Sequence, residues 1–365
     1  MTMAIRVLEE FVAEQESRTR LAAFQAWNLL RASDLATPLP PVPWLCEPLG
    51  LAPGPVALVA GYGYSRKTMA LQSLALSVAA ARPVWGVWST RRGRVVHLDY
   101  EQGRRLTQER YQRLARGMGF EMSDLSDEDL HVACMPRVYL ESQDSLDSLL
   151  PVVEGAALVV VDSLRAAFPH ADENSSDVRS YLDALNHLSE RTGACIAVIH
   201  HARKPNAQSG GTATHAIRGS SALFDACQSV YVFEGEKDTA TTVHHQKDRV
   251  RGTTLEPFGI TSEDITGPTG DRRWGLRVVH LEAEQMAQSQ RMKVSEAREA
   301  AIARAEDAIV EALTGVGGTF AGTRTEIRSL AGVRNDAFDQ AWVRLKTAGR
   351  LVREGSHRDG IWRLV

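Results

Sequence analysis

Cysteine is scarce in this sequence and is never closely spaced. The four cysteines, Cys46, Cys134, Cys195 and Cys227, lie far apart and form no Cys-x-x-Cys pair. Cys134 and Cys195 lie in apolar, strand-like runs, so we expect buried free thiols. Free thiols suit a reducing cytoplasm, which is the compartment we expect for this protein.

Long apolar runs and an excess of positive charge are also absent. No apolar run approaches the roughly 20 residues of a membrane span. Residues 1–20 carry acids and no apolar core, so we expect no secretory signal peptide. The 365 residues are 44% hydrophobic and 24% charged, with a net charge of −3, which is ordinary for a globular protein of more than one domain. A nucleic-acid partner would therefore be met by local basic patches or by a ring of subunits.

The rest of the chain is organised around residues 56–68. An apolar run at 56–60 predicts a buried strand, a glycine-containing turn follows, and an Ala- and Leu-rich stretch at 69–81 predicts a helix. Strand, glycine loop and helix with Lys67-Thr68 at its start is the layout of a phosphate-binding loop. Lys67 can reach the terminal phosphates and the Thr68 hydroxyl can ligate Mg²⁺. We expect ATP to be held by Gly61, Tyr62, Gly63, Tyr64, Ser65, Arg66, Lys67, Thr68 and Met69.

Arg66 departs from the usual pattern, because a second glycine is expected at its position. Glycine there lets the backbone approach the phosphates closely, and a side chain can demand a costly left-handed conformation. Three outcomes stay open. Arg66 either donates to the phosphates of a working ATPase, or slows hydrolysis and leaves a nucleotide switch, or abolishes binding and leaves a scaffold.

Charged and polar residues follow three further predicted strands. Glu101 comes just past a predicted strand that begins at Val95 and ends near Asp99. Asp162 ends a β-branched run at 157–161, and His200-His201 end a third run at 194–199. In open α/β sheets the carboxyl edge carries the ligand. An aspartate there can hold Mg²⁺ through water. The plainer interpretations are a surface acid for Glu101 and a turn cap for Asp162.

The order of elements predicts the fold class. Strands alternating with helices to about residue 200, followed by runs of strands at 228–233, 242–247, 257–260 and 274–281, indicate an α/β fold with a mostly parallel sheet and an antiparallel extension. Residues 1–33 have helical spacing, with Leu8, Phe11, Val12, Leu21, Phe24 and Leu29 as the apolar positions. They form either an arm that packs on a neighbouring subunit or a helix that covers its own domain.

The last fifty residues change character. A short helix from 323, a helix at 335–348 and two strands near 349–354 and 360–364 predict a small winged helix-turn-helix. It contacts either duplex DNA or a protein. The DNA interpretation assigns contacts to the helix and to the wing, through Arg344, Arg353, His357 and Arg358.

The ordered set of strand, loop, Lys67-Thr68, Glu101, Asp162, His200-His201 and the Lys247/Arg249 pair resembles the RecA-like ATPases. It is most similar to the RepA-type branch of hexameric replicative helicases, which is related to the DnaB-type helicases. The resemblance covers roughly residues 40–282. It divides the chain into an N-terminal helical arm (1–38), a RecA-like core (39–282), a connecting helix (283–314) and the winged helix (315–365).

The resemblance implies a role for each site residue. Glu101 would orient or deprotonate the attacking water, and Asp162 would organise Mg²⁺. His201, or else His200, would sense the γ-phosphate and relay its state to a Gly- and Ser-rich loop at 203–217. That loop would face single-stranded DNA in a central channel, and its contacts would be Arg203, Lys204 and Arg218.

The resemblance also implies a homo-oligomer, with a hexamer favoured. Lys247 and Arg249 would project into the neighbouring subunit's site and stabilise the transition-state charge. The sequence thus supports an ATP-driven ring motor on DNA, of the helicase-like or replication-associated kind. The alternative is a non-motor DNA-binding regulator, in which the core is an oligomerisation platform and the winged helix carries the activity.

Overall fold

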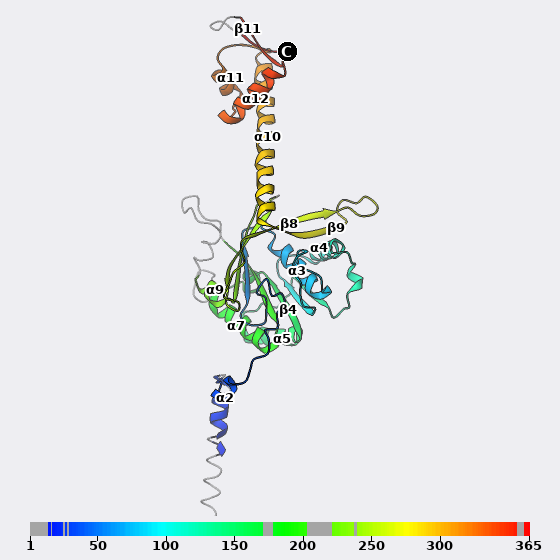
Figure 1. Ribbon diagram of the computed structural model, residues 1–365, viewed down its shortest axis with the longest axis vertical. Helices are drawn as coiled ribbons and strands as arrows, with labels where there is room; N and C mark the ends of the chain where they lie inside the picture. The colour runs from blue at the N-terminus through cyan, green and yellow to red at the C-terminus, as the bar shows by residue number, and fades with distance from the viewer. Residues whose placement is uncertain are drawn as a thin grey trace, which may run out of the picture. The chain divides into compact units, whose positions relative to one another are not determined.

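The structure is a computed structural model that describes residues 14–15, 17–24, 26–27, 29–170, 178–202, 221–236, 239–355 and 361–365. The chain divides into two units, residues 1–43 and residues 44–365. In the first unit, residues 17–24 are helical and a one-turn helix, α2 (Ala32–Leu35), follows (Figure 1). No described side chain of this unit is buried, and Trp27 is 78% exposed. The predicted apolar positions Leu8, Phe11 and Val12 lie outside the described residues.

A nine-stranded sheet forms the centre of the second unit, in the order β3-β2-β4-β5-β1-β6-β7-β8-β9. Its strands are β1 (Ala57–Gly61), β2 (Arg94–Asp99), β3 (Leu130–Cys134), β4 (Ala156–Asp162), β5 (Cys195–His201), β6 (Ser229–Glu234), β7 (Thr241–Asp248), β8 (Phe258–Ile265) and β9 (Gly275–Leu281). The pairs from β3 to β6 are parallel, and those from β6 to β9 are antiparallel. The predicted mostly parallel sheet with an antiparallel extension is confirmed. Every residue of β1 and β4 is buried, as their apolar, β-branched composition predicts.

Helices cover both faces of the parallel part of the sheet (Figure 1). They are α3 (Lys67–Ala80), α4 (Arg104–Gly117), the short η1 (Met122–Asp124), α5 (Gln143–Val153), α6 (Leu164–Ala167), α7 (Val178–Thr192) and α9 (Ser221–Ala226). Apolar residues of α3 and α4 share one cluster with one face, and those of α5, α6, α7 and α9 share another cluster with the opposite face. The helices that follow the neighbouring strands β2 and β4 therefore leave towards opposite faces. The crevice between such strand ends is where open α/β sheets bind ligands.

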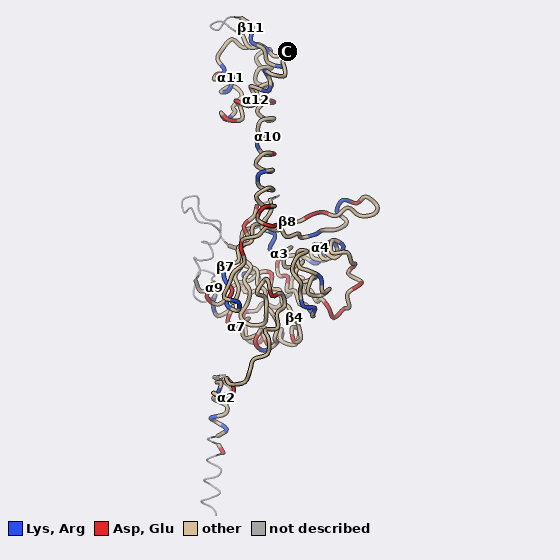
Figure 2. The backbone as a smooth tube through the Cα atoms, in the orientation of Figure 1, with Lys and Arg blue, Asp and Glu red and all other residues tan. Residues whose placement is uncertain are grey.

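A third hydrophobic cluster belongs to the C-terminal elements. These are α10 (Ala283–Gly315), β10 (Thr319–Ala321), α11 (Arg324–Ala331), α12 (Asn335–Thr347), β11 (Leu351–Glu354) and β12 (Ile361–Leu364). Ile302, Ile309 and Leu313 of α10 are buried with Phe338 and Trp342 of α12. The predicted connecting helix thus contributes its second half to this core, while basic and acidic residues are interspersed along it (Figure 2).

The predicted two-stranded wing has a third strand. Its order is β10-β12-β11, and Phe320 of β10 pairs with Trp362 of β12. The three-residue β10 lacks the alternating pattern that marks a longer strand, so the sequence did not reveal it. Within the described residues, no helix is both long and apolar enough to cross a membrane. All four cysteines are free thiols, although Cys134 on the edge strand β3 is only partly buried.

Candidate nucleotide-binding site

Gly61 ends β1 at a crowded point of the sheet. It pairs with His201 of β5 on one side and with Phe233 of β6 on the other. A Cβ atom at Gly61 would lie 2.3 Å from the Phe233 carbonyl oxygen, which no side chain can tolerate. The first glycine of the predicted phosphate loop is therefore required by the close approach of β6.

The loop after Gly61 closes around the Lys67 ammonium. Lys67 Nζ donates hydrogen bonds to the carbonyl oxygens of Gly61 (2.9 Å) and Tyr62 (2.7 Å) and to Ser65 Oγ (3.2 Å). Burial lowers the pKa of Lys67 to about 8, although Asp162 and Glu101 act in the opposite direction. The buried cation thus lies at the start of α3, where the helix dipole and free N–H groups already favour an anion.

The other predicted loop residues lie at different depths. Gly63 and Tyr64 are exposed, and Tyr64 has a left-handed φ of 66°. Tyr62 packs against the core, and Thr68 and Met69, in the first turn of α3, are partly buried. The loop is therefore buried at Gly61, Ser65 and Lys67 and exposed to solvent at Gly63 and Tyr64.

Arg66 adopts the left-handed conformation that the missing glycine would favour, with φ 62° and ψ 13°. That conformation costs a non-glycine residue roughly 1–2 kcal/mol. Its guanidinium group bonds to the Thr239 carbonyl oxygen, to Thr241 Oγ1 (3.2 Å) and to Ser262 Oγ (3.3 Å). Those partners belong to the segment before β7, to β7 and to β8, so this side chain reaches across the end of β6.

Glu101 lies in the turn after β2, between two hydrogen-bond donors. His201 Nε2 lies 3.0 and 3.2 Å from its two carboxylate oxygens, and the Ser163 hydroxyl donates to Oε1. The hydrogen bond from His201 is the main cause that lowers the pKa of Glu101, opposed by partial burial. Glu101 is therefore an ionised carboxylate at neutral pH, which is the form a general base needs.

Asp162 ends β4 in full burial and fits a cation site. Neither carboxylate oxygen has a hydrogen-bond partner among the described residues. Burial raises its pKa to about 7, and the nearby Thr68 hydroxyl opposes the rise without reaching hydrogen-bond geometry with either oxygen. Two unsatisfied buried oxygens beside a hydroxyl suit Mg²⁺. No cluster of three His, Cys, Asp or Glu in the described part of the chain could hold a metal alone, so phosphate and water oxygens would complete such a site.

The two histidines at the end of β5 differ in environment. His201 meets Glu101, whereas His200 is buried. Burial lowers the pKa of His200 to about 4, so it stays neutral at physiological pH. Of the two alternatives for a γ-phosphate sensor, His201 is the one in contact with the candidate base.

Sequence reasoning missed a supporting residue, Asp99, which is fully buried at the end of β2. Its Oδ1 accepts hydrogen bonds from the backbone N–H groups of Glu101 (3.1 Å) and Gln102 (2.8 Å). Its Oδ2 accepts from the Thr107 hydroxyl at 2.6 Å. Asp99 thereby shapes the turn that carries Glu101. The available signal was an acid at the last position of a predicted strand, two residues before Glu101.

The predicted finger residues, Lys247 and Arg249, lie at the opposite end of the strands from the Lys67 loop. Lys247 pairs with Val230 at the start of β6, and β7 ends at Asp248, one residue before Arg249. Both side chains bond to the Asp225 carbonyl oxygen, Arg249 at 2.6 Å. Within one subunit, the structure therefore does not bring them to the Lys67 loop.

The predicted nucleic-acid contacts are only partly described. Arg203, Lys204, Arg218, His357 and Arg358 lie outside the described residues. Arg344 on α12 forms an ion pair with Glu299 of α10 at 2.7 Å, and Arg353 lies over the Trp362 ring at 5.2 Å.

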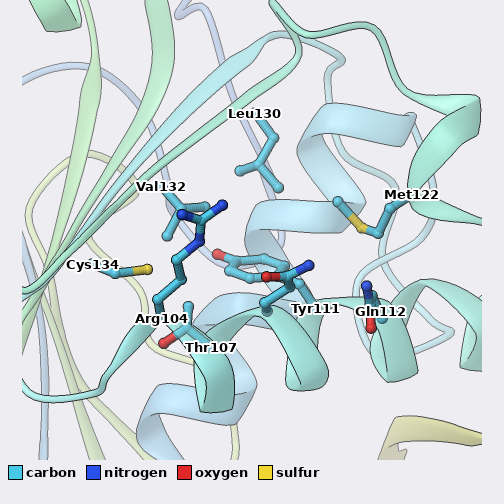
Figure 3. Close-up of a pocket in the computed structure, with 9 residues that line it drawn as sticks. Arg104, Thr107, Tyr111, Gln112, Met122, Leu130, Val132 and Cys134 are labelled. Atoms are coloured by element: carbon cyan, nitrogen blue, oxygen red, sulfur yellow. The ribbon is translucent and has the colours of Figure 1, made fainter.

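A separate cavity of about 340 Å³ lies between α4 and β3 (Figure 3). Thr107 and Tyr111 of α4 face Leu130, Val132 and Cys134 of β3 across it. One of its lining residues, Thr107, donates its hydroxyl hydrogen bond to Asp99, which supports the turn that carries Glu101. The candidate site residues Lys67, Glu101 and Asp162 are not among the residues that line this cavity.

The mostly parallel sheet, the Lys67 loop and the carboxylates at the ends of β2 and β4 define a P-loop nucleotide-binding domain. The AAA domain family matches residues 17–207, just over half of the chain, and the chain belongs to this family. Among solved structures, the crystal structure of the RadB recombinase is similar, with a TM-score of 0.41 and 18% sequence identity. That similarity covers 63% of this chain and 94% of RadB.

Proposed function

We propose that this protein is a RecA-like, ATP-hydrolysing motor that forms a ring on DNA. One observation carries the hydrolysis part. The ammonium of Lys67 lies close enough to both Asp162 and Glu101 for each acid to affect its pKa. A cation for phosphate, an acid for Mg²⁺ and a candidate base thus meet at one sheet edge, as phosphoryl transfer to water requires.

The residues then divide the work. Lys67 and the first N–H groups of α3 hold the β- and γ-phosphates of ATP, the substrate. Thr68 and Asp162 hold Mg²⁺, which when bound neutralises charge on the phosphate oxygens. Glu101, kept ionised and oriented by His201 and Ser163, aligns a water with the γ-phosphate and accepts its proton.

His201 couples this chemistry to DNA. It is the last residue of β5, and only Ala202 separates it from the segment at 203–217 that we assign to single-stranded DNA. Because His201 bonds to Glu101, any change at the γ-phosphate that moves Glu101 changes the start of that segment. Arg203, Lys204 and Arg218 are the proposed phosphate contacts.

Lys247 and Arg249 act on a neighbouring subunit. Lys247 lies near the start of β6, whereas the Lys67 loop follows the end of β1 beside the end of β6. We therefore assign the two residues to the nucleotide site of a second copy of the chain. A finger supplied in this way stabilises transition-state charge and requires oligomerisation. We propose a homo-oligomer, with a hexamer as the favoured ring.

The C-terminal elements are proposed to be a winged helix-turn-helix that binds duplex DNA. The order α11, α12, β11, β12, the added strand β10 and a hydrophobic core of their own support this assignment. Arg344, Arg353 and Arg358 are the proposed contacts.

The second candidate is a non-motor regulator, in which the core only holds nucleotide. Arg66 is the observation that favours this candidate. It stands where the usual second glycine is missing, and its guanidinium group bonds to β7 and β8. In this case DNA binding would need neither hydrolysis nor Glu101.

ATP turnover with and without single-stranded DNA tests the proposal. The wild type should hydrolyse ATP faster with DNA. Glu101→Gln should lose at least about 100-fold of that turnover while still binding ATP, as expected for a general base. The control Glu128→Gln removes an exposed acid away from the site and should behave as wild type. DNA binding without any turnover in the wild type would select the regulator.

A further inference from the structure

We infer that Arg66 is a positioning residue that ties the phosphate loop to β7 and β8, and is not a phosphate ligand. The tether itself is a property of the fold. Its effect on nucleotide rests on the proposed function. This role differs from all three outcomes that the sequence leaves open for Arg66, and it excludes the first, in which Arg66 donates to the phosphates.

The position of Arg66 makes a tether effective. It is the residue before α3, so it is covalently joined to Lys67, whose ammonium is the centre of the loop. Its left-handed backbone is unfavourable for any residue with a Cβ atom. A side chain persists in such a conformation when surrounding contacts hold it there.

The contacts that hold it come from far along the chain. Thr241 Oγ1 and Ser262 Oγ are 175 and 196 residues away in sequence, at 3.2 and 3.3 Å. The Thr239 carbonyl oxygen is a third acceptor. Thr241 is fully buried, so its hydroxyl is a fixed acceptor with little freedom to move. The planar guanidinium group bonds to all three with donors in a fixed fork, which the single ammonium of lysine cannot reproduce.

The direction of these contacts separates a tether from a ligand. The sheet order places β6 between β1, which leads into the loop, and β7, which starts at Thr241. The side chain therefore points away from Gly61 and reaches past β6 to Thr241 on β7. Donors committed to Thr239, Thr241 and Ser262 keep the loop backbone in place for phosphate while Lys67 supplies the charge.

Three variants separate the possibilities. Arg66→Gly removes the tether and also the unfavourable backbone, Arg66→Lys keeps a cation without the fork, and Thr241→Val removes one acceptor while keeping Arg66 and the side-chain volume. Thr242→Val is the matched control, because the neighbouring residue points to the other face of β7. For each, we would measure amide hydrogen exchange of residues 62–68 without nucleotide, the Kd for ATP with Mg²⁺, and turnover at saturating ATP.

A tether predicts the same change in Arg66→Gly and Thr241→Val. Loop amides should exchange about tenfold faster, and the Kd for ATP should rise by a similar factor, as loss of a charge-assisted hydrogen bond predicts. Turnover at saturating ATP should change less than the Kd. Arg66→Lys should fall between these variants and the wild type, and Thr242→Val should match the wild type.

Two results would overturn the inference. Weaker ATP binding in Arg66→Gly with unchanged loop exchange and unchanged Thr241→Val would make the guanidinium group a phosphate ligand. Faster turnover in Arg66→Gly alone would make Arg66 a brake. A wild type that binds no ATP would contradict the proposed function, while hydrogen exchange without nucleotide would still decide whether the tether exists.

Discussion

His201 Nε2 lies 3.0 Å from Glu101 Oε1 and joins the ends of two strands that are not neighbours. Glu101 follows β2, His201 ends β5, and β4 with Asp162 lies between them in the sheet. The contact therefore spans the strand that carries the candidate Mg²⁺ ligand. Under the proposed function, a change of the phosphate at this end of the sheet would reach both the candidate base Glu101 and the chain that follows β5.

Replacing His201 should uncouple hydrolysis from DNA. In His201→Ala, Glu101 keeps the Ser163 hydroxyl but loses its other side-chain partner, so basal turnover should fall about tenfold or more. Stimulation by single-stranded DNA should fall further, because the link to the segment after β5 is gone. Steady-state turnover across a DNA titration measures both effects.

The matched control for that variant is His187→Ala, which removes an exposed histidine on α7. It should leave turnover and stimulation unchanged. Equal DNA stimulation in His201→Ala and wild type would show that His201 carries no signal.

Mixing two inactive variants should restore activity if Arg249 acts between subunits. Lys67→Ala lacks the loop cation and Arg249→Ala lacks the finger, so the ATP turnover of each variant alone should fall by about 1,000-fold or more. In an equimolar mixture, about a quarter of the interfaces would pair an intact loop with an intact finger. Turnover measured against mixing ratio should peak near equal amounts.

Arg272→Ala, which removes an exposed arginine between β8 and β9, is the control for this experiment. When Arg272→Ala is mixed with Lys67→Ala, ATP turnover should fall in proportion to the falling share of Arg272→Ala, with no peak near equal amounts. A mixture of Lys67→Ala and Arg249→Ala that stays as inactive as its parts would contradict action in trans.

The strand ends were predictable because each carries its own local signal. Asp162 follows a run of buried β-branched residues, and parallel strands all end at one edge, so its approach to Lys67 follows from topology. The destination of the Arg66 side chain was not predictable in this way. Its partners Thr241 and Ser262 are common residues with no motif, and only the pairing of β6, β7 and β8 brings them near.

The position of Lys247 and Arg249 shows a similar limit. Residues two apart on a strand point to the same side, and both side chains do reach the Asp225 carbonyl oxygen, although β7 ends before Arg249. Which edge of the sheet they occupy depends on the antiparallel return of β7, which a two-residue motif cannot encode. Asp99 was missed for the opposite reason, since its role is to hold backbone N–H groups and such a role leaves little trace in sequence.

Phe338→Ala should unfold the C-terminal elements without disabling the nucleotide site. Phe338 is 1% exposed and lies 5.3 Å from the Trp342 ring, so its truncation should cost about 3–5 kcal/mol. Its cluster shares no residue with the two clusters of the central sheet. Calorimetry should show one transition shifted to lower temperature, with ATP binding unchanged and duplex DNA binding reduced.

Val343→Ala provides the comparison on the same helix. Val343 is 60% exposed, so its stability effect should stay within about 0.5 kcal/mol. A loss of ATP binding in Phe338→Ala equal to its loss of DNA binding would contradict separate cores.

Acid should destabilise the central sheet partly through His245, which is buried on β7. Leu255 N–H donates to its Nδ1 at 3.2 Å, Ser229 Oγ lies 2.9 Å from its Nε2, and the Tyr231 ring stacks on it at 4.3 Å. Protonation would break the hydrogen bond from Leu255. Burial is the main cause that lowers the pKa of His245 to about 4, with Arg251 adding to the effect and Asp248 opposing it.

The folded pKa of His245 lies below the unfolded value of about 6.5, so the unfolded state binds more protons between those values. Its contribution to stability is complete above about pH 6.5 and is lost as the pH falls towards 4, by about 1.4 kcal/mol per pH unit. Urea unfolding of wild type and His245→Asn at pH 7 and pH 5 measures this difference. His97 and His200, whose pKa values burial also lowers to about 4, are present in both proteins and cancel. The variant should therefore lose less stability than the wild type on acidification, and parallel losses would show that His245 is protonated in the folded protein.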